Sequence, residues 1–328
     1  MSKLVTIYGG SGFVGRHIAR RMARNGWRVR VAVRRPNEAI FVRPYGAVGQ
    51  VEPVFCNIRD DASVRAVMEG ADAVVNCVGT FDATGRNNFE AVQTEGAGRI
   101  ARIAAEMGVA RMVHISAIGA SHDSRSRYAR SKAAGEDAVR TAFSNAVILR
   151  PSVVFGVEDK FFNRFAGMTR MGPFLPLVGA RSRFQPVYVD DVAHAAELAL
   201  LGQAAPGIYE LGGPEAKTFR ELMEQMLQVI RRRRVIIGLP FWFGALMGLV
   251  LDFAQRITLG LFTNSILTAD QVITLRSDNV VTEGARGFAD LGITPTPLEA
   301  VLPEYLWRYR PTGEFEAMRE SAGHLPHG

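Results

Sequence analysis

The strongest constraint on the fold is a run of spaced glycines near the start of the chain, the segment GGSGFVG from Gly9 to Gly15. A short apolar run, residues 4–8, precedes it, and apolar residues recur every fourth position after it, as at Ile18 and Met22. The first pattern is typical of a buried strand and the second of an amphipathic helix. Glycines at 9, 12 and 15 would allow a tight turn, close approach of a ligand and close packing of the helix. The amides that begin such a helix favour an anion such as a pyrophosphate.

Strand and helix patterns alternate through the first 150 residues. Further strands are expected at 29–33, 51–55, 73–78, 112–116 and 147–150, and helices at 62–69, 89–107 and 128–143. Buried strands separated by helices predict an α/β fold with a doubly wound parallel sheet of the Rossmann type. Together with the glycine turn, this alternation predicts a dinucleotide-binding domain over residues 1–150.

Beyond Arg150 the alternation loosens, and prolines interrupt the chain. Helices are expected at 191–201 and 219–230. We therefore predict that residues 151–328 form a smaller C-terminal region, α-rich or mixed, with some elements returning to the main sheet.

The end of the second strand carries Arg34 and Arg35, where NAD-selective sites usually place an acid for the ribose hydroxyl. Two guanidinium groups would instead pair with a 2′-phosphate. This predicts NADPH (NADP) rather than NAD as the cofactor, unless both arginines are ordinary surface charges.

Other cofactor contacts follow from position along the sheet. Asn57 and Ile58 follow the third strand, where adenine contacts form, and the fourth strand ends near the expected cofactor ribose. Either asparagine could instead cap a turn. The predicted cofactor-binding residues are Gly9, Ser11, Gly12, Phe13, Val14, Gly15, Arg34, Arg35, Asn57, Ile58, Asn76, Val78, Gly79, Ser116, Tyr128, Lys132, Pro151, Ser152 and Val153.

Tyr128 and Lys132 are four residues apart and therefore share one face of the helix expected at 128–143. A nearby ammonium lowers the pKa of a phenol, so such a tyrosine could act as a general acid or base. The lysine could also bond the nicotinamide ribose. The pair is therefore a candidate catalytic or cofactor-positioning site.

The glycine spacing, the strand-end asparagine and the Tyr-x-x-x-Lys pattern resemble the short-chain dehydrogenase/reductase superfamily in its extended or atypical form. In that family a serine after the fifth strand completes a catalytic triad. Here that position falls on Ala117, and Ser116, one residue earlier, is a weak substitute. The family's helix asparagine is replaced near Gln93. These departures weaken the case for catalysis and leave nucleotide binding intact, and no metal-ligand cluster offers another chemistry.

Longer blocks are similar to the nucleotide-binding accessory subunits of respiratory complex I. The blocks are His114–Ala120, Tyr128–Glu136, Leu149–Gly156, Gln185–Ala193 and Thr268–Val272, the last followed by Leu275 and Asp278–Val281. This resemblance implies a tightly bound, structural NADPH. It also implies docking against other complex I subunits at the junction of the peripheral and membrane arms, near the quinone site.

The net charge of +7 comes mostly from arginine, including the run Arg231–Arg234. That run is either a solvated face or a site for an anionic partner such as lipid headgroups. The absence of interleaved aromatic residues argues against nucleic acid.

The next segment, residues 235–262, is almost wholly apolar, but Pro240 interrupts it and the unbroken part, residues 241–251, is too short to span a bilayer. It is either a core helix or a helix that docks on a membrane surface or an apolar partner. Gly244, Gly248, Asp252 and Arg256 would form a small and polar stripe on it.

The sequence begins with a strand and shows no signal or transit leader. Its two cysteines fit a reducing compartment. We therefore expect a peripheral protein on the cytoplasmic face of a bacterial inner membrane, or on the matrix side in a eukaryote. The favoured function is a non-catalytic, NADPH-stabilised complex I subunit. The alternatives are a free-standing NADP-dependent reductase, dehydrogenase or epimerase, and an NADP(H)-sensing regulator.

Overall fold

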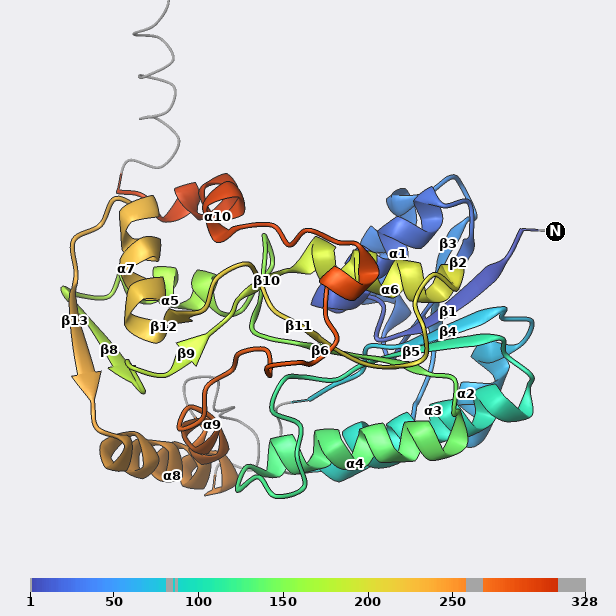
Figure 1. The fold of residues 1–328 in the computed structure, drawn as a ribbon, viewed down its shortest axis with the longest axis horizontal. Helices are drawn as coiled ribbons and strands as arrows, with labels where there is room; N and C mark the ends of the chain where they lie inside the picture. The colour runs from blue at the N-terminus through green and yellow to red at the C-terminus, as the bar shows by residue number, and fades with distance from the viewer. Residues whose placement is uncertain (1, 81–84, 86–87, 258–267, 312–328) are drawn as a thin grey trace, which may run out of the picture. The chain divides into compact units, whose positions relative to one another are not determined.

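The computed structural model describes residues 2–80, 85, 88–257 and 268–311, with the backbone alone at 252–257. The chain divides into two compact units that alternate along the sequence (Figure 1). Unit 1 comprises Met1–Ser152, Val189–Gly212 and Val280–Pro295. Unit 2 comprises Val153–Tyr188, Gly213–Asn279 and residues 296–328.

Unit 1 is built on a seven-stranded sheet in which every neighbouring pair of strands is parallel. The strand order is β11-β6-β5-β4-β1-β2-β3. This confirms the predicted doubly wound sheet, because the order reverses direction between β1 and β4. The strands are β1 (Leu4–Tyr8), β2 (Arg28–Val33), β3 (Val51–Phe55), β4 (Ala73–Asn76), β5 (Arg111–Ile115), β6 (Val147–Pro151) and β11 (Gly207–Leu211).

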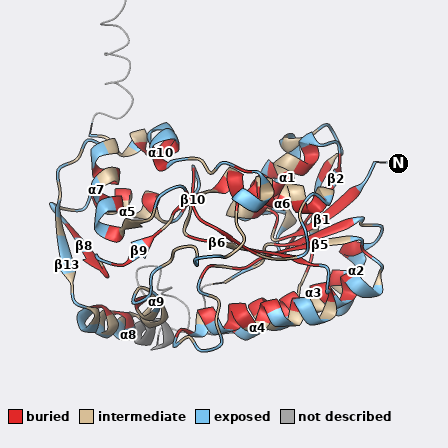
Figure 2. Ribbon diagram, in the orientation of Figure 1, coloured by how far each residue is buried: buried red, intermediate tan, exposed pale blue. Residues whose placement is uncertain are grey.

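Helices cover both faces of this sheet (Figure 1). On one face α1 (Phe13–Arg24) packs against α6 (Val189–Leu201), and Arg21 joins the two helices by ion pairs of 2.7 Å with Asp190 and with Glu197. On the other face lie α2 (Asp61–Met68), α3 (Glu95–Glu106) and α4 (Arg127–Ala142). Their inner faces and the strands form the buried core (Figure 2).

Two irregular helices depart from the expected pattern. The segment after β2 is a 3₁₀ helix, η1 (Pro36–Tyr45), where no element was expected. The helix expected at 89–107 begins with a π-helical turn, η2 (Glu90–Thr94), and continues as α3. Helix α4 packs very closely here, because a Cβ added at Gly135 would lie 2.1 Å from the carbonyl oxygen of Gln93. The extra residue of the π turn is therefore placed directly against α4.

Unit 2 is a smaller mixed structure of short strand pairs and helices around an aromatic core that includes Phe155, Phe162 and Phe219. β7 (Val154–Phe155) pairs with β10 (Val187–Tyr188), β9 (Arg183–Phe184) with β12 (Lys217–Thr218), and β8 (Phe174–Val178) with β13 (Val235–Leu239). The helices are α5 (Phe162–Met168), α7 (Phe219–Val229), α8 (Phe241–Ile257), α9 (Ala269–Thr274), α10 (Leu298–Leu306) and the short η4 (Trp307–Tyr309), while η3 (Ala289–Leu291) belongs to unit 1.

The apolar segment from residue 235 is not one helix. Its first five residues form β13, parallel to β8, and the helix α8 begins only after Pro240. Proline supplies no amide for the ladder, so it ends the strand and can precede a helix. Residues 258–262 and the side chains of Asp252 and Arg256 lie outside the described residues. Within the described ranges no helix has both the length and the apolar character that crossing a membrane requires.

Candidate nucleotide-binding site

The glycine turn after β1 has the geometry that its sequence predicted. Gly9 has a φ of +74°, and its amide donates to the carbonyl oxygen of Ala32 at 3.0 Å. A Cβ added at Gly15 would lie 2.5 Å from the Gly9 oxygen, and one at Gly12 would lie 3.1 Å from the same oxygen. A side chain at 15 would therefore collide with the turn that joins β1 to α1, and one at 12 would crowd it.

The start of α1 is suited to an anion. Gly12 is the N-cap and supplies no side-chain cap, and the first turn holds no acidic residue. The amides of Phe13, Val14 and Gly15 thus begin a helix whose dipole favours negative charge at this end. The residues present fit a pyrophosphate, because glycine keeps the backbone accessible and no carboxylate competes for it.

The two arginines expected to read a 2′-phosphate lie at the end of β2. Both are exposed. Arg35 forms an exposed ion pair of 3.0 Å with Glu38, three residues later in η1. Such a surface pair contributes little energy, so it would not prevent the guanidinium from turning to a phosphate.

The two predicted asparagines both stabilise turns. The Oδ1 atom of Asn57 accepts from the amide of Arg59 at 3.2 Å, and that of Asn76 accepts from the amide of Val78 at 3.0 Å. Ile58 packs against Gly96 on the core side of unit 1. These residues therefore shape the backbone at the carboxyl ends of β3 and β4, which is the edge where ligands bind in such sheets.

Tyr128 and Lys132 lie together on α4, as predicted. The Lys132 Nζ atom is 5.9 Å from the centre of the Tyr128 ring, donates to the Ile115 carbonyl at 3.2 Å, and would be 3.7 Å from a Cβ at Gly79. The pair therefore meets the end of β4, where the ribose was expected.

The predicted pKa of Tyr128 was wrong in direction. Burial raises the pKa of the Tyr128 phenol to about 12, and Lys132 does not offset this. Burial in turn lowers the pKa of Lys132 to about 8, while Glu136 and Cys77 act in the opposite direction. A phenol with a raised pKa is a poor base at neutral pH.

Ser116 makes its side-chain contact with Glu136, one turn beyond Lys132 on α4. Its hydroxyl forms a short hydrogen bond with the buried carboxylate of Glu136. Glu136 accepts two bonds from Arg150, at 2.9 and 2.7 Å, and Arg150 also reaches Glu210 at 3.3 Å. Ser116 therefore belongs to a buried ion-pair network, and the catalytic position itself is occupied by Ala117, which has no hydroxyl.

Gln93 lies where the family places an asparagine, in the π-helical turn η2. Its Nε2 atom donates to the carbonyl of Thr80 at 2.6 Å, and its Oε1 atom accepts from the Ser131 hydroxyl at 3.4 Å. Gln93 thus connects the chain after β4 to α4. Helical distortions of this kind are frequent at functional sites.

Sequence reasoning missed His114, on β5 beside Asn76 of β4. The Asn76 Nδ2 atom lies 3.2 Å from the His114 Nδ1 atom, and the Asn76 Oδ1 atom is already used by Val78. Nδ1 must therefore accept, which places the proton on Nε2. That buried Nε2 has no hydrogen-bond partner in the described chain. Burial lowers the pKa of His114 to about 3, and Lys132 adds to the effect, so the ring is neutral. Only its position opposite a strand-end asparagine could have indicated it.

The last residue of β6 and the two that follow it contribute backbone contacts. The Pro151 carbonyl accepts from Ile118 at 3.0 Å, and the Ser152 amide donates to Leu211 at 2.9 Å, both within unit 1. Val153 belongs to unit 2, where its carbonyl accepts from Val187. Among the residues whose side chains are described, no group of three or more acidic, histidine or cysteine residues is arranged to hold a metal.

Comparison with known proteins agrees with this geometry. Residues 5–212, more than half of the chain, match the NAD dependent epimerase/dehydratase family, which is named for its nicotinamide dinucleotide. The dTDP-glucose 4,6-dehydratase DesIV of Streptomyces venezuelae has the same fold, with a TM-score of 0.70, 21% identity and 98% coverage of both chains.

Curated relatives are more similar still. The mitochondrial protein named NADH dehydrogenase (ubiquinone) 1 alpha subcomplex subunit 9 is 36% identical in Arabidopsis thaliana, over 94% of this chain and 79% of the plant protein. The protein of that name in Mus musculus is 33% identical, over 94% of this chain and 80% of its own. A ceramide reductase of Caulobacter vibrioides is 33% identical, over 72% and 74%. The predicted resemblance is confirmed: the chain belongs to the NAD dependent epimerase/dehydratase family, and within it to the relatives that include the alpha subcomplex subunit 9 of mitochondrial NADH dehydrogenase.

Proposed function

We propose that this protein is a non-catalytic, NADPH-binding accessory subunit of the proton-pumping NADH:quinone oxidoreductase, complex I. The observation that carries the proposal is the likeness to the plant subunit over 94% of the chain, which extends through unit 2 and well past the family match. Its role is to stabilise the junction of the peripheral and membrane arms near the quinone site.

The proposed cofactor is NADPH, held in a structural role. The glycine turn and the start of α1 would hold the pyrophosphate, and Arg34 and Arg35 would pair with the 2′-phosphate. Lys132 and the end of β4 would position the nicotinamide ribose. When bound, the nicotinamide is able to carry a hydride, but the residues around it favour retention of the cofactor over hydride transfer to a substrate. Calorimetry with the purified chain tests the selectivity, and tighter binding of NADH than of NADPH would contradict it.

The absence of catalysis is inferred from two residues. Ala117 occupies the position where a serine would orient a substrate oxygen, and Tyr128 has its pKa raised to about 12. A protonated phenol without its partner hydroxyl is a weak general base at neutral pH. Neither feature prevents nucleotide binding, which needs hydrogen bonds and not proton transfer.

The proposed location is peripheral, on the cytoplasmic face of a bacterial inner membrane or the matrix side of a mitochondrial one. Its partners are other complex I subunits at the arm junction. The finer proposal is that anionic lipid headgroups also contact the protein near Arg231–Arg234 and the apolar segment that follows.

Purification of a tagged chain from detergent-solubilised membranes tests this function. We expect complex I subunits and NADH:quinone activity to accompany the chain, and bound NADPH to survive dialysis. Tyr128→Phe should leave electron transfer and assembly unchanged, whereas Gly12→Val should reduce assembly because its side chain crowds the pyrophosphate. A chain that purifies alone, or a large loss of turnover in the Tyr128→Phe enzyme with normal assembly, would exclude a structural role.

A second candidate is a free-standing NADP-dependent reductase. Two observations favour it: the retained Tyr128 and Lys132 pair, and the 33% identity to a protein named ceramide reductase. The discriminating assay follows NADPH consumption by the soluble chain with keto lipids of the ceramide class. Turnover that disappears in Tyr128→Phe would establish the reductase and remove the structural proposal.

A further inference from the structure

The helix α8 turns its large apolar residues away from the protein. Its small residues face inward: a Cβ at Gly244 would lie 2.7 Å from the Val178 side chain, and one at Gly248 would lie 2.8 Å from the Ala269 amide. The opposite face carries exposed large apolar residues, of which Trp242 is 67% and Leu249 is 60% exposed. The glycine stripe is therefore the packing face, and a core position for the whole helix is excluded.

Exposed apolar residues continue from α8 into β13. The set comprises Val235, Ile237, Trp242, Phe243, Leu246, Leu249 and Val250, and we call it the apolar face. No Asp or Glu occurs anywhere from residue 231 to residue 251. The five that belong to α8 share one face of the helix, and an exposed apolar face of this kind marks a site that something else covers.

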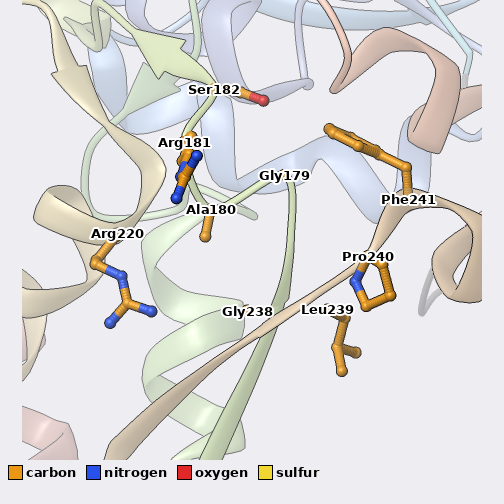
Figure 3. Close-up of a pocket in the computed structure, with 9 residues that line it drawn as sticks. All are labelled: Gly179, Ala180, Arg181, Ser182, Arg220, Gly238, Leu239, Pro240 and Phe241. Atoms are coloured by element: carbon orange, nitrogen blue, oxygen red, sulfur yellow. The ribbon is translucent and has the colours of Figure 1, made fainter.

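A cavity of about 600 Å³ opens where β13 meets α8. Figure 3 shows Arg181 and Arg220 on one side of it and Leu239, Pro240 and Phe241 on the other. Among the described residues no acid lines the cavity, and Arg220 makes a long, exposed ion pair of 3.8 Å with Glu224 and a contact of 3.5 Å with the Ile236 carbonyl. The cavity therefore joins two guanidinium groups to an apolar wall, which suits a ligand with an anionic head and an apolar body.

At the other end of β13 lies a cluster of arginines without carboxylate partners. Each is held by a main-chain carbonyl oxygen: Arg234 by Thr169 at 2.9 Å, Arg232 by Tyr309 at 2.8 Å, and, in the same way, Arg170, Arg308 and Arg310. Within the described chain none of the five forms an ion pair with an acid. Carbonyl bonds fix these groups without neutralising them, and burial, followed by the charges of Arg234 and Arg170, lowers the pKa of Arg232.

We propose that β13 and α8 lie on an anionic phospholipid surface. The apolar face enters the headgroup and acyl boundary, and Arg181 and Arg220 bind a headgroup phosphate, with the arginine cluster adding attraction at the other end of β13. The charges favour a membrane over a protein partner. A layer of lipid phosphates supplies anions both to Arg181 and Arg220 and to the arginine cluster, whereas a hydrophobic protein surface would leave these cations unpaired. An exposed tryptophan on α8 also fits the interface, where its amphipathic ring is favoured.

The inference rests on the proposed docking at the membrane arm, but the test uses the purified chain alone, without other complex I subunits. Purified full-length chain is mixed with vesicles of phosphatidylcholine alone or with phosphatidylglycerol, and bound protein is recovered by flotation. We expect binding to the phosphatidylglycerol vesicles and a blue shift of tryptophan emission that Trp242→Phe removes. Arg181→Glu/Arg220→Glu should weaken this binding by about tenfold or more, since each basic group near such a surface contributes on the order of 1 kcal/mol.

Matched variants distinguish binding at the proposed lipid site from a general effect of surface charge or surface hydrophobicity. Arg24→Glu/Arg140→Glu makes the same charge change on exposed residues of unit 1, and should reduce binding far less. Trp242→Ser/Leu246→Ser should abolish flotation with the phosphatidylglycerol vesicles, whereas Val48→Ser, an exposed control in unit 1, should not.

Three outcomes would overturn the proposal: no flotation, equal binding to both vesicle types, or equal loss in the paired charge variants. Co-purification with membrane-arm subunits that depends on Trp242 while vesicle binding is absent would assign the apolar face to a protein partner. In that case the lipid proposal fails and the complex I proposal survives.

Discussion

At the scale of single residues, Lys132 links the candidate site to the stability of unit 1. The residue is 5% exposed, its ammonium lies beside a neutral histidine and a protonated tyrosine, and it donates to a main-chain carbonyl. An interior charge with one neutral acceptor costs stability unless a ligand supplies more. The arrangement is consistent with a site that gains stability when its ribose hydroxyls arrive.

The pH dependence of folding should report this buried lysine. The folded chain loses the Lys132 proton near pH 8, and the unfolded chain loses it near 10.5, so the unfolded state binds more protons in between and stability rises with pH across that window. Lys132→Met should be more stable than the wild type at about pH 7, and its advantage should shrink by about 2 kcal/mol toward about pH 9.5. Urea unfolding of nucleotide-free protein measures this, with the exposed Lys160→Met as control. A constant difference across the range would contradict the buried charge.

The glycine turn makes a second residue-scale prediction. Gly15→Ala places a Cβ 2.5 Å from the Gly9 oxygen, so α1 or the turn must shift. We expect a loss of about 1–3 kcal/mol in unfolding free energy, as in other overpacked sites, together with weaker NADPH binding. Gly172→Ala has open space around the added carbon and should be nearly neutral in both urea unfolding and calorimetry. Equal effects at the two positions would mean that the turn is not close-packed.

At the scale of elements, the network of Glu136, Arg150 and Glu210 joins α4, β6 and β11. The Glu210 carboxylate also accepts from the Thr282 amide at 2.8 Å, so the network fixes the last segment of unit 1 as well. Arg150→Met would leave two carboxylates buried without a cation, at a cost of about 3–5 kcal/mol. The matched control is Arg65→Met at the exposed pair with Glu106, which should cost less than about 1 kcal/mol. Urea unfolding tests both, and similar losses would show that the network is not effectively buried.

The elements of unit 1 could be predicted from the sequence because each is defined by a local signal. Apolar periods predicted each strand and α-helix of unit 1 up to β6, although not the 3₁₀ helix η1, and the glycine spacing predicted the turn between β1 and α1. β13 was hidden within an apolar run that has no period, and only its pairing with β8 makes it a strand. His114 and the pKa of Tyr128 depend on burial, which arises from contacts between distant segments. The sequence pattern could place Tyr128 beside Lys132 but could not show how strongly the surroundings exclude water.

At the scale of the whole molecule, the chain leaves unit 1 after residue 152 and returns to it twice. The first return supplies α6, which packs on α1 through the Arg21 ion pairs, and β11, which completes the sheet beside β6. The core of the dinucleotide-binding unit is therefore not complete within the first 152 residues, although its motifs are.

A fragment of residues 1–152 should accordingly fail to fold on its own. Without α6 and β11, the face of α1 that carries His17 and Arg21 and the edge of β6 become exposed. We expect no cooperative urea transition and a weak near-ultraviolet circular dichroism signal. A chain in which a flexible linker joins residues 1–152 to residues 189–212 should regain a cooperative transition, because it restores both missing elements. Cooperative folding and NADPH binding by the short fragment would show that the returning segments are not needed to complete the domain.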